Sequence, residues 1–339
     1  VQACDHEKID DTTGMKKHPL VSILIPVYNK ASYVAEAIDS CLHQTYPHIE
    51  IIIVDDGSTD GSWDIVKNYA DRYPDRMKVF RQDNKGACAA RNKAFELSSG
   101  QYIQYLDADD MLAPDKIEHQ IKYFEGSGEE DYVVNGRWGR FKTHIHEQID
   151  WGPHPSICKD LAPVEWIIAG HMSAICGWLT PRYLIEKTGS WDEQLQVNQD
   201  GEFFTRVVLN SSRVLFCDQA RIYYRSYLQD HSISKRYRKV EAMQSYLQTI
   251  FSLEKHLLAK EDSPRTRKYL SSRYMQFVYM YYPQAREEVQ IALNRVHQFG
   301  KPDVTVQGGK ALQLIDRLLG WRIALTLRFL LRYRAYALR

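Results

Sequence analysis

Short apolar runs that alternate with helical spacing limit the fold of this chain more than any other feature. Residues 21–27 (VSILIPV) and 49–54 are almost continuously apolar, which is typical of strands that a sheet buries on both faces. Residues 77–81 and 102–106 predict two more strands, and segments with helical spacing separate the four. This alternation predicts an α/β fold with a Rossmann-like, doubly wound and mostly parallel sheet.

Polar motifs follow three of these strands, at residues 26–29, 55–60 and 107–110. In open parallel sheets, ligands bind outside the carboxyl ends of the strands. The three motifs therefore predict one shared binding site at that edge of the sheet.

The stretch GQYIQYLDADDMLAPD, residues 100–115, places three carboxylates where a buried strand ends. In extended backbone Asp107 and Asp109 point to one face and Asp110 to the other. The repulsion between the paired carboxylates must be offset, and a divalent cation is the most economical candidate. Mg²⁺ or Mn²⁺ suits one or two carboxylates completed by water and phosphate oxygens. Helix capping is the alternative, but Pro114 predicts that the next helix starts there, with Ala113 as its cap.

The composition excludes several other classes of protein. Among 339 residues, 44% are hydrophobic and the net charge is +1, so we expect no nucleic-acid partner. The six cysteines form no CxxC pair, which favours a reducing compartment over structural zinc. We see no apolar leader and no apolar run of about 18 residues, so we expect a cytoplasmic protein. Rossmann dehydrogenases and P-loop NTPases are disfavoured because no GxGxxG or GKS/T motif follows a strand.

Five ordered motifs carry a resemblance to a known family. The segments VSILIPVYN, IIIVDDGSTDGS, NKGACAARN, YLDADD and GSWDEQLQVNQDGEFFTR, followed by IYYRSYLQDHSIS, resemble family 2 glycosyltransferases of the GT-A fold over residues 19–235. The resemblance implies inverting transfer of a sugar from a nucleotide diphosphate donor, UDP by default, to an acceptor hydroxyl. It also implies Mn²⁺ or Mg²⁺ as cofactor and a glycan or lipid-linked acceptor in cell-envelope polysaccharide or glycolipid synthesis.

Two other functions compete with this interpretation. A sugar-nucleotide pyrophosphorylase uses a related sheet, but it needs a glycine-rich loop after the first strand, and PVYNKASY has no glycine. A catalytically inactive nucleotide-sugar or glycan binding protein of the same fold is favoured only by Gln199, which stands where the family has glutamate.

The resemblance assigns the donor site to residues at the strand ends. Tyr28 can stack on the nucleobase, one of the two carboxylates at 55–56 accepts a hydrogen bond from uracil, and Arg91 offers a fork to phosphate. Each has a structural alternative: Tyr28 could simply be a turn residue, the carboxylates at 55–56 could lie in a loop beside a helix N-terminus, and Arg91 could be a surface arginine. The full predicted set is Pro26, Tyr28, Asn29, Asp55, Asp56, Gly86, Arg91, Asn92, Asp107 and Ala108.

The resemblance also implies a catalytic base and a metal site. Asp200 matches the aspartate of the family's Glu-Asp motif and is the expected base; the competing role is a helix N-cap. Glu202 should face away from it on a helix. The expected metal ligands are Asp107, Asp109 and His231, although the YLQD insertion leaves a simple loop histidine equally compatible with position 231.

Domain boundaries follow from the change in rhythm along the chain. We expect a flexible leader at 1–18, the glycosyltransferase domain at 19–235 and a helical region at 236–339, with breaks at Ser263-Pro264, Tyr282-Pro283, 300–302 and Gly308-Gly309. One basic amphipathic helix is predicted at 313–338, with leucines on one face and arginines on another. It predicts peripheral membrane contact through 313–339 at the inner face of the membrane; the alternative is packing of the leucines on the protein body.

Overall fold

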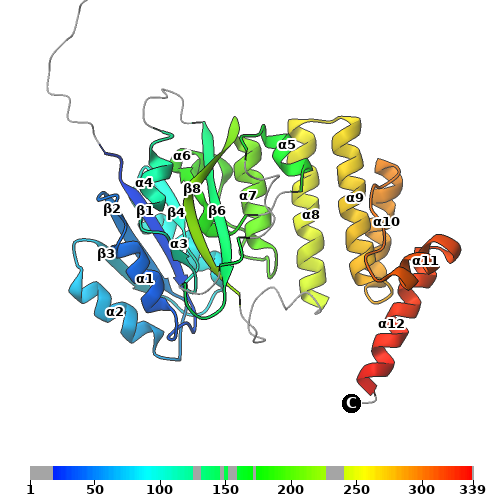
Figure 1. The fold of residues 1–339 in the computed structure, drawn as a ribbon, viewed down its shortest axis with the longest axis horizontal. Coiled ribbons are helices and arrows are strands. Elements are labelled where there is room, and N and C mark those ends of the chain that lie inside the picture. Colours follow the sequence, from blue (N-terminus) through cyan, green and yellow to red (C-terminus); the bar gives the residue numbers. More distant parts are fainter. Residues whose placement is uncertain are drawn as a thin grey trace, which may run out of the picture.

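An eight-stranded sheet forms the centre of the computed structural model, which describes residues 18–124, 131–145, 149–151, 159–170, 173–226 and 240–337 (Figure 1). Its strand order is β3-β2-β1-β4-β7-β6-β8-β5. The strands are β1 (Val21–Val27), β2 (Ile49–Asp55), β3 (Met77–Arg81), β4 (Tyr102–Tyr105), β5 (Met111–Leu112), β6 (Tyr132–Phe141), β7 (Trp178–Pro181) and β8 (Arg213–Arg225).

The sheet is mostly parallel, as predicted. Strands β3, β2, β1 and β4 pair in parallel, and β6 pairs with β8 in parallel. Strand β7 runs antiparallel to both β4 and β6, and the short β5 runs antiparallel to β8. The four parallel strands therefore bring their carboxyl ends to one edge, where the polar motifs follow.

Helices cover both faces of the sheet, so its central strands are buried on both faces. In β1, Ile23 and Ile25 pack in the core cluster that includes α1 (Val34–Leu42), α2 (Ser62–Arg72) and α4 (Lys116–Ile121). Leu24 packs in the other cluster, with α3 (Ala87–Leu97), α5 (Pro163–Ile168), α6 (Arg182–Thr188) and α7 (Gln199–Asn210). The side chains alternate between two apolar layers, which explains the continuous apolar run.

The structure corrects the prediction for residues 106–116. Strand β4 ends at Tyr105, and residues 107–110 form a turn in which the Asp110 N–H donates to the Asp107 carbonyl at 3.0 Å. The extended-strand argument for Asp107 and Asp109 was therefore wrong. Helix α4 begins at Lys116 with Asp115 as its N-cap, rather than at Pro114.

The C-terminal helices are α8 (Val240–Lys260), α9 (Pro264–Tyr281), α10 (Arg286–Phe299), α11 (Lys310–Leu319) and α12 (Trp321–Ala337). The predicted breaks before α9, α10 and α11 are confirmed, and Ser263 caps α9 in a reciprocal capping box with Thr266. One core cluster includes Phe203 of α7, Ile250 of α8 and Phe277 of α9. The helical region and the sheet domain thus share a core.

The last helix is two helices rather than one. Gly320 has φ +82° and ψ 161°, a backbone conformation that essentially only glycine adopts. It ends α11, and α12 starts at the next residue. The two form an elbow that projects from the body (Figure 1).

Candidate active site

Arg91 connects the carboxylate turn to the helix that carries Asp200. Its Nη2 donates to Asp107 Oδ1 at 2.8 Å and its Nη1 to Gln199 Oε1 at 3.2 Å. The guanidinium is buried and lies 4.7 Å from the ring centre of Trp191. Arg91 is therefore not a surface arginine. In this structure its guanidinium is hydrogen-bonded both to Asp107 and to Gln199 at the start of α7.

Asp200 lies in the first turn of α7 and is exposed. Asn198, with φ +54°, is the N-cap, so the alternative role of Asp200 as a cap is wrong. Although the residue is exposed, protein atoms surround much of its carboxyl group. This desolvation raises the pKa of Asp200, while the charge of Arg91 acts to lower it. An exposed carboxylate with a raised pKa has the properties of a general base.

Glu202 has a structural role on another side of α7, as predicted. It is buried and forms a two-point ion pair with Arg206, at 2.7 and 2.9 Å. Ser252 of α8 also donates to Glu202, at 2.6 Å. Arg206 in turn donates to the carbonyls of Thr188 and Ser190, both at 2.9 Å. These contacts fix α7 and leave Asp200 as the exposed carboxylate of its first turn.

The three carboxylates of the 107–110 turn have different partners. Asp109 forms an ion pair with Lys30, which follows β1. Asp110 is buried, and its Oδ1 accepts from the Arg225 N–H at 2.8 Å. Burial and the charges of Asp109 and Asp107 raise the pKa of Asp110 well above its usual range.

Arg225, which the sequence analysis did not single out, holds the carboxylate turn from β8. Its Nε donates to the Asp109 carbonyl and its Nη1 to the Thr143 carbonyl, both at 2.9 Å, and its Nη2 pairs with Glu36 of α1. The side chain is buried, with the ring centre of Phe141 4.4 Å away. Its position at the last residue of β8 becomes apparent only in the structure.

The structure distinguishes the two carboxylates that follow β2. Asp56 accepts three hydrogen bonds of 2.8 Å, from Gln82 Nε2 and from the N–H groups of Lys85 and Gly86. Asp55 is fully buried; its Oδ2 contacts Arg81 and the Ser58 N–H, while its Oδ1 has no hydrogen-bond partner among the described residues. Asp56 therefore anchors the loop before α3, and Asp55 has an acceptor oxygen left for a ligand.

The remaining predicted donor residues divide between an accessible surface and structural positions. Tyr28 is 47% exposed. Asn29 has φ +50°, and its Oδ1 accepts from the Thr59 N–H at 2.9 Å, which ties the loops after β1 and β2 together. Pro26 belongs to β1, and Ala108 is buried in the core. Only Tyr28 of these four offers an exposed side chain large enough to stack.

Asn92 holds the backbone that precedes α7. Its side chain donates to the Trp191 carbonyl at 3.0 Å and accepts from the Trp191 N–H at 2.9 Å. The amide also donates to Glu193, at 2.8 Å. Asn92 therefore positions the Asp200 segment, a different task from the predicted donor contact.

His231 lies outside the described residues. Within the part of the chain that the structure describes, no group of three or more His, Cys, Asp or Glu side chains could hold a metal. The predicted metal pair, Asp107 and Asp109, supplies carboxylate oxygens only.

The fold is similar to the GT-A fold, as the sequence predicts. Residues 22–174 match the model of Glycosyl transferase family 2. An uncharacterized glycosyltransferase of Rickettsia typhi is 36% identical over 196 residues, which cover 57% of this chain and 60% of the relative. TuaG of Bacillus subtilis, a glycosyltransferase named for teichuronic acid biosynthesis, is 44% identical over 106 residues, 31% of this chain and 42% of the relative. The chain thus spans about three fifths, or less, of the length of these curated relatives.

A solved structure shares the fold. The crystal structure of S. aureus TarS residues 1–349 in complex with UDP-GlcNAc aligns with a TM-score of 0.65 and 19% identity, covering 83% of this chain and 81% of that one. This share is larger than residues 1–235 alone can provide, so the structural likeness includes part of the helical region.

Proposed function

We propose that this chain is an inverting, metal-dependent glycosyltransferase that moves a sugar from a nucleotide diphosphate sugar to an acceptor hydroxyl. The observation that carries the proposal is the Arg91 bridge, which ties Asp107 and the Asp200 helix to one buried guanidinium. This arrangement would set a phosphate-side carboxylate and a base at a fixed separation on one edge of the sheet. We favour UDP as the nucleotide because TarS, which shares the fold, was solved with UDP-GlcNAc.

The donor nucleotide would lie over the ends of β1 and β2. Tyr28 offers an exposed ring for stacking on the base. Asp55 Oδ1 is a buried acceptor without a partner among the described residues, a costly state that a ring N–H of the base would relieve. Asp56 is committed to the Gly86 loop, so we assign base recognition to Asp55.

Asp107 and Asp109 fit a Mg²⁺ or Mn²⁺ ion by the chemistry of their oxygens. Each carboxylate has one oxygen paired with a cationic side chain, Arg91 or Lys30. Mg²⁺ is typically coordinated by one or two carboxylates, with phosphate and water oxygens as its other ligands. When bound, the ion would offset charge on the departing diphosphate.

Asp200 would accept the proton of the acceptor hydroxyl as that oxygen attacks the sugar. Its raised pKa makes it a stronger base than an ordinary aspartate, while the charge of Arg91 favours its ionised form. TuaG is named for teichuronic acid biosynthesis, and this supports a cell-envelope glycan or lipid-linked molecule as acceptor. We propose that the enzyme works on the cytoplasmic side, at the membrane surface.

Thermal unfolding with nucleotides tests the proposal. UDP, GDP, dTDP and ADP are each added with and without Mn²⁺, and a hundredfold excess over the dissociation constant should raise the free energy of unfolding by roughly 2.7 kcal/mol. We expect stabilisation by UDP that grows with Mn²⁺, and Asp109→Asn should remove the metal-dependent part. No stabilisation by any nucleotide would contradict the proposal. Stabilisation without release of UDP from UDP-sugars in the presence of acceptor extracts would favour the inactive binding protein.

A further inference from the structure

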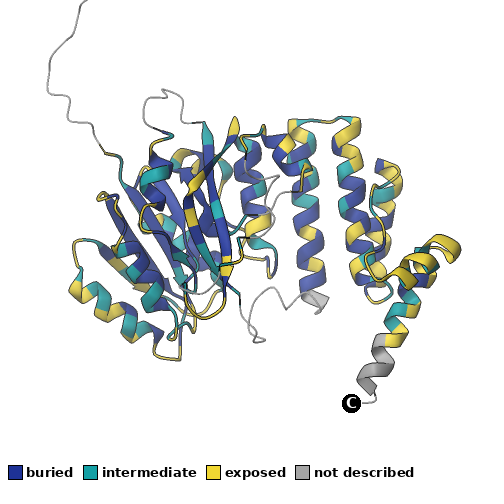
Figure 2. Ribbon diagram, in the orientation of Figure 1, coloured by how far each residue is buried: buried dark blue, intermediate teal, exposed yellow. Residues whose placement is uncertain are grey.

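The C-terminal arm, residues 310–337, carries most of the exposed large apolar side chains of the described chain. Outside the arm only Tyr28, Phe80, Tyr183, Met280 and Ile291 belong to this group among the described residues. On the arm the exposed fractions range from 38% to 72%, and Figure 2 shows α11 as a largely exposed element. The residues are Leu314, Leu318, Leu319, Ile323, Leu327, Leu330 and Leu331.

The arm is attached to the body through the other side of α12. Trp321 lies against Tyr279 and Tyr282, with ring centres 6.0 and 5.2 Å apart. Arg328 donates to the carbonyls of Tyr279, at 2.9 Å, and Gln307, at 3.2 Å. Arg328 therefore belongs to the attached face, which corrects its predicted place on a membrane-facing basic face.

The apolar face points away from this attachment. At 100° per residue, Ile323, Leu327, Leu330 and Leu331 lie within an arc of about 100° on α12, and all four are exposed. The buried Leu325 lies on the attached side. The predicted alternative, in which these leucines pack on the protein body, is wrong for the residues named here.

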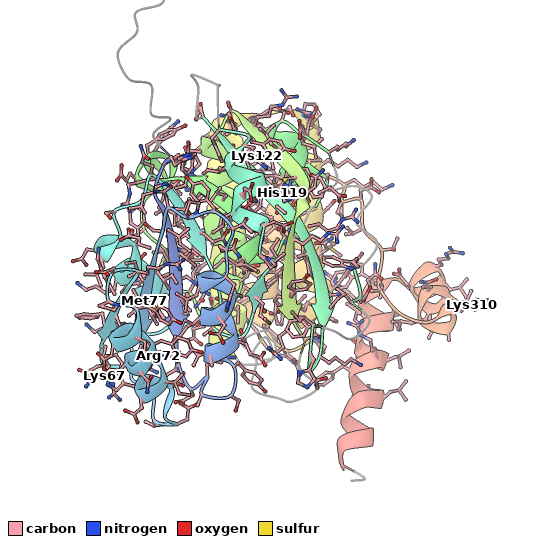
Figure 3. The ribbon with its side chains drawn as sticks, turned by 60° about the vertical axis from the view of Figure 1, so that its left-hand side comes forward. Lys67, Arg72, Met77, His119, Lys122 and Lys310 are labelled. Carbon is pink, nitrogen blue, oxygen red and sulfur yellow. The ribbon has the colours of Figure 1, made fainter. Side chains whose placement is uncertain are left out.

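The arm also concentrates positive charge. Six arginines and one lysine against one aspartate give residues 310–339 a net charge of +6; since the whole chain carries +1, residues 1–309 carry −5. Lys310, Arg317 and Arg322 are exposed beside the apolar face, and Figure 3 shows Lys310 on the arm, apart from the sheet. A partner of this surface must therefore be both apolar and anionic.

A second copy of the chain fits this surface poorly. Two arms in contact would bring their arginines together, and like charges disfavour such a pair. The body is acidic, but its exposed large apolar residues in the described part are few and come from elements far apart in sequence. No helix in the described chain is long and apolar enough to cross a bilayer, so the arm would lie in the interface.

We propose that the C-terminal arm docks this chain on the surface of an anionic lipid bilayer, with its leucine face at the acyl boundary and Lys310, Arg317 and Arg322 at the lipid phosphates. Apolar insertion combined with a few basic contacts gives reversible binding that depends on anionic lipid. The docking itself is independent of the transfer reaction; only its use, to reach a lipid-linked acceptor, rests on the proposed function.

Vesicle sedimentation of the full chain tests the docking. We expect binding to phosphatidylcholine vesicles that contain phosphatidylglycerol, little binding without it, and weakening by salt. The double variant L318Q/L331Q should bind about tenfold more weakly, and R317Q/R322Q should lose most of the dependence on anionic lipid. The matched control Met280→Gln removes an exposed apolar side chain outside the arm and should bind like the parent.

Several outcomes would overturn the docking proposal. These are parent binding no stronger to anionic than to neutral vesicles, unchanged binding of L318Q/L331Q, or a dimer that L318Q/L331Q converts to a monomer in place of vesicle binding. The nucleotide-induced thermal shift is measured on every variant. If the thermal shift persists in a variant that no longer binds vesicles, the body is folded and only the function of the arm is lost. If the thermal shift is absent while the protein still binds vesicles, the proposed function is contradicted and the docking proposal stands.

Discussion

At the scale of residues, Asp200 is the carboxylate on which the proposed chemistry depends most directly. Asp200→Asn keeps the shape of the side chain and removes the base, so transfer should fall by about 10²–10⁴-fold while the UDP-induced thermal shift remains. Because the pKa of Asp200 is raised, activity of the parent should fall with decreasing pH at a higher pH than for an ordinary aspartate. Initial rates against pH check both effects. Asp64→Asn, at an exposed position on α2, is the control; equal losses in both variants would refute the assignment.

Arg225 is a positioning residue for the carboxylate turn. Arg225→Lys keeps the charge but loses the planar fork that reaches the Asp109 and Thr143 carbonyls together. Since residues that orient metal ligands typically change metal affinity 10–100-fold, we expect roughly that increase in the Mn²⁺ concentration for half-maximal activity.

The Mn²⁺ titration is run beside a donor titration, because a purely structural defect would lower both responses with stability. The control is Arg140→Lys, which alters an exposed arginine of β6. An unchanged Mn²⁺ requirement in a folded Arg225→Lys protein would remove Arg225 from this role.

Sequence reasoning could locate the carboxylates at 107–110 because polar residues follow an apolar run there. It located the segment at Asp200 only through the resemblance to the family. Which polar atom remains available could not be predicted, because it depends on partners distant in the chain. The oxygens of Asp56 accept hydrogen bonds from the N–H groups of Lys85 and Gly86, and the side-chain oxygen of Asn92 accepts one from the Trp191 N–H.

At the scale of elements, the start of α4 contains an unusual charge. Lys116 is fully buried, donates to Gln104 of β4, and burial lowers its pKa from the ordinary value of 10.5 to about 7. An unfolded chain then binds more protons than the folded one between about pH 7 and 10.5, so this group costs stability below pH 7 and the cost disappears as pH rises through that range.

Lys116→Met should therefore stabilise the protein near pH 6 by an amount on the order of a few kcal/mol, less the loss of the Gln104 contact, and much less near pH 10. Urea unfolding at both pH values measures the difference. Lys122→Met, at an exposed position after α4, should give the same small change at both. A stabilisation by Lys116→Met that does not shrink with pH would contradict a buried, titrating lysine.

The bounds of β1 and β3 could be predicted from the sequence: burial on both faces makes β1 a continuous apolar run, and turn residues flank β3. The elbow at Gly320 could not, since the apolar spacing continues on both sides of it and only the backbone angles reveal the break. Likewise, the residues after β4 look extended in the sequence, but a hydrogen bond within the backbone closes them into a turn.

At the scale of the whole molecule, the helical region completes the core of the sheet domain. Residues of α8 accept hydrogen bonds from the segment that leads into α7. The Gln196 N–H donates to Ser245 Oγ at 2.8 Å, and Asn198 Nδ2 donates to Thr249 Oγ1 at 2.9 Å. Leu247, Ile250 and Tyr274 are buried in the same cluster as α7. Residues 19–235 therefore lack part of their own core when α8 and α9 are removed.

A chain that ends at residue 235 should be insoluble or unfold without a cooperative transition, because α7 would expose this cluster. A chain that ends at residue 309 should retain the cooperative transition, since Ala324 and Leu325 are the fully buried residues of the described arm and their burial is worth about 2–3 kcal/mol. Calorimetry of the two truncations checks this. A stable, nucleotide-responsive protein from residues 19–235 would contradict the shared core.

The order of strands in the sheet has a consequence for how such genes can diverge. The first four strands occupy one side of the sheet and come from residues 21–105, whereas the other four occupy the opposite side and come from residue 111 onward. A recombination event between these segments would separate the strands at which we propose that the nucleotide binds from the segment that carries Asp200. The two halves of the sheet could thus be exchanged independently, with the carboxylate turn as their boundary.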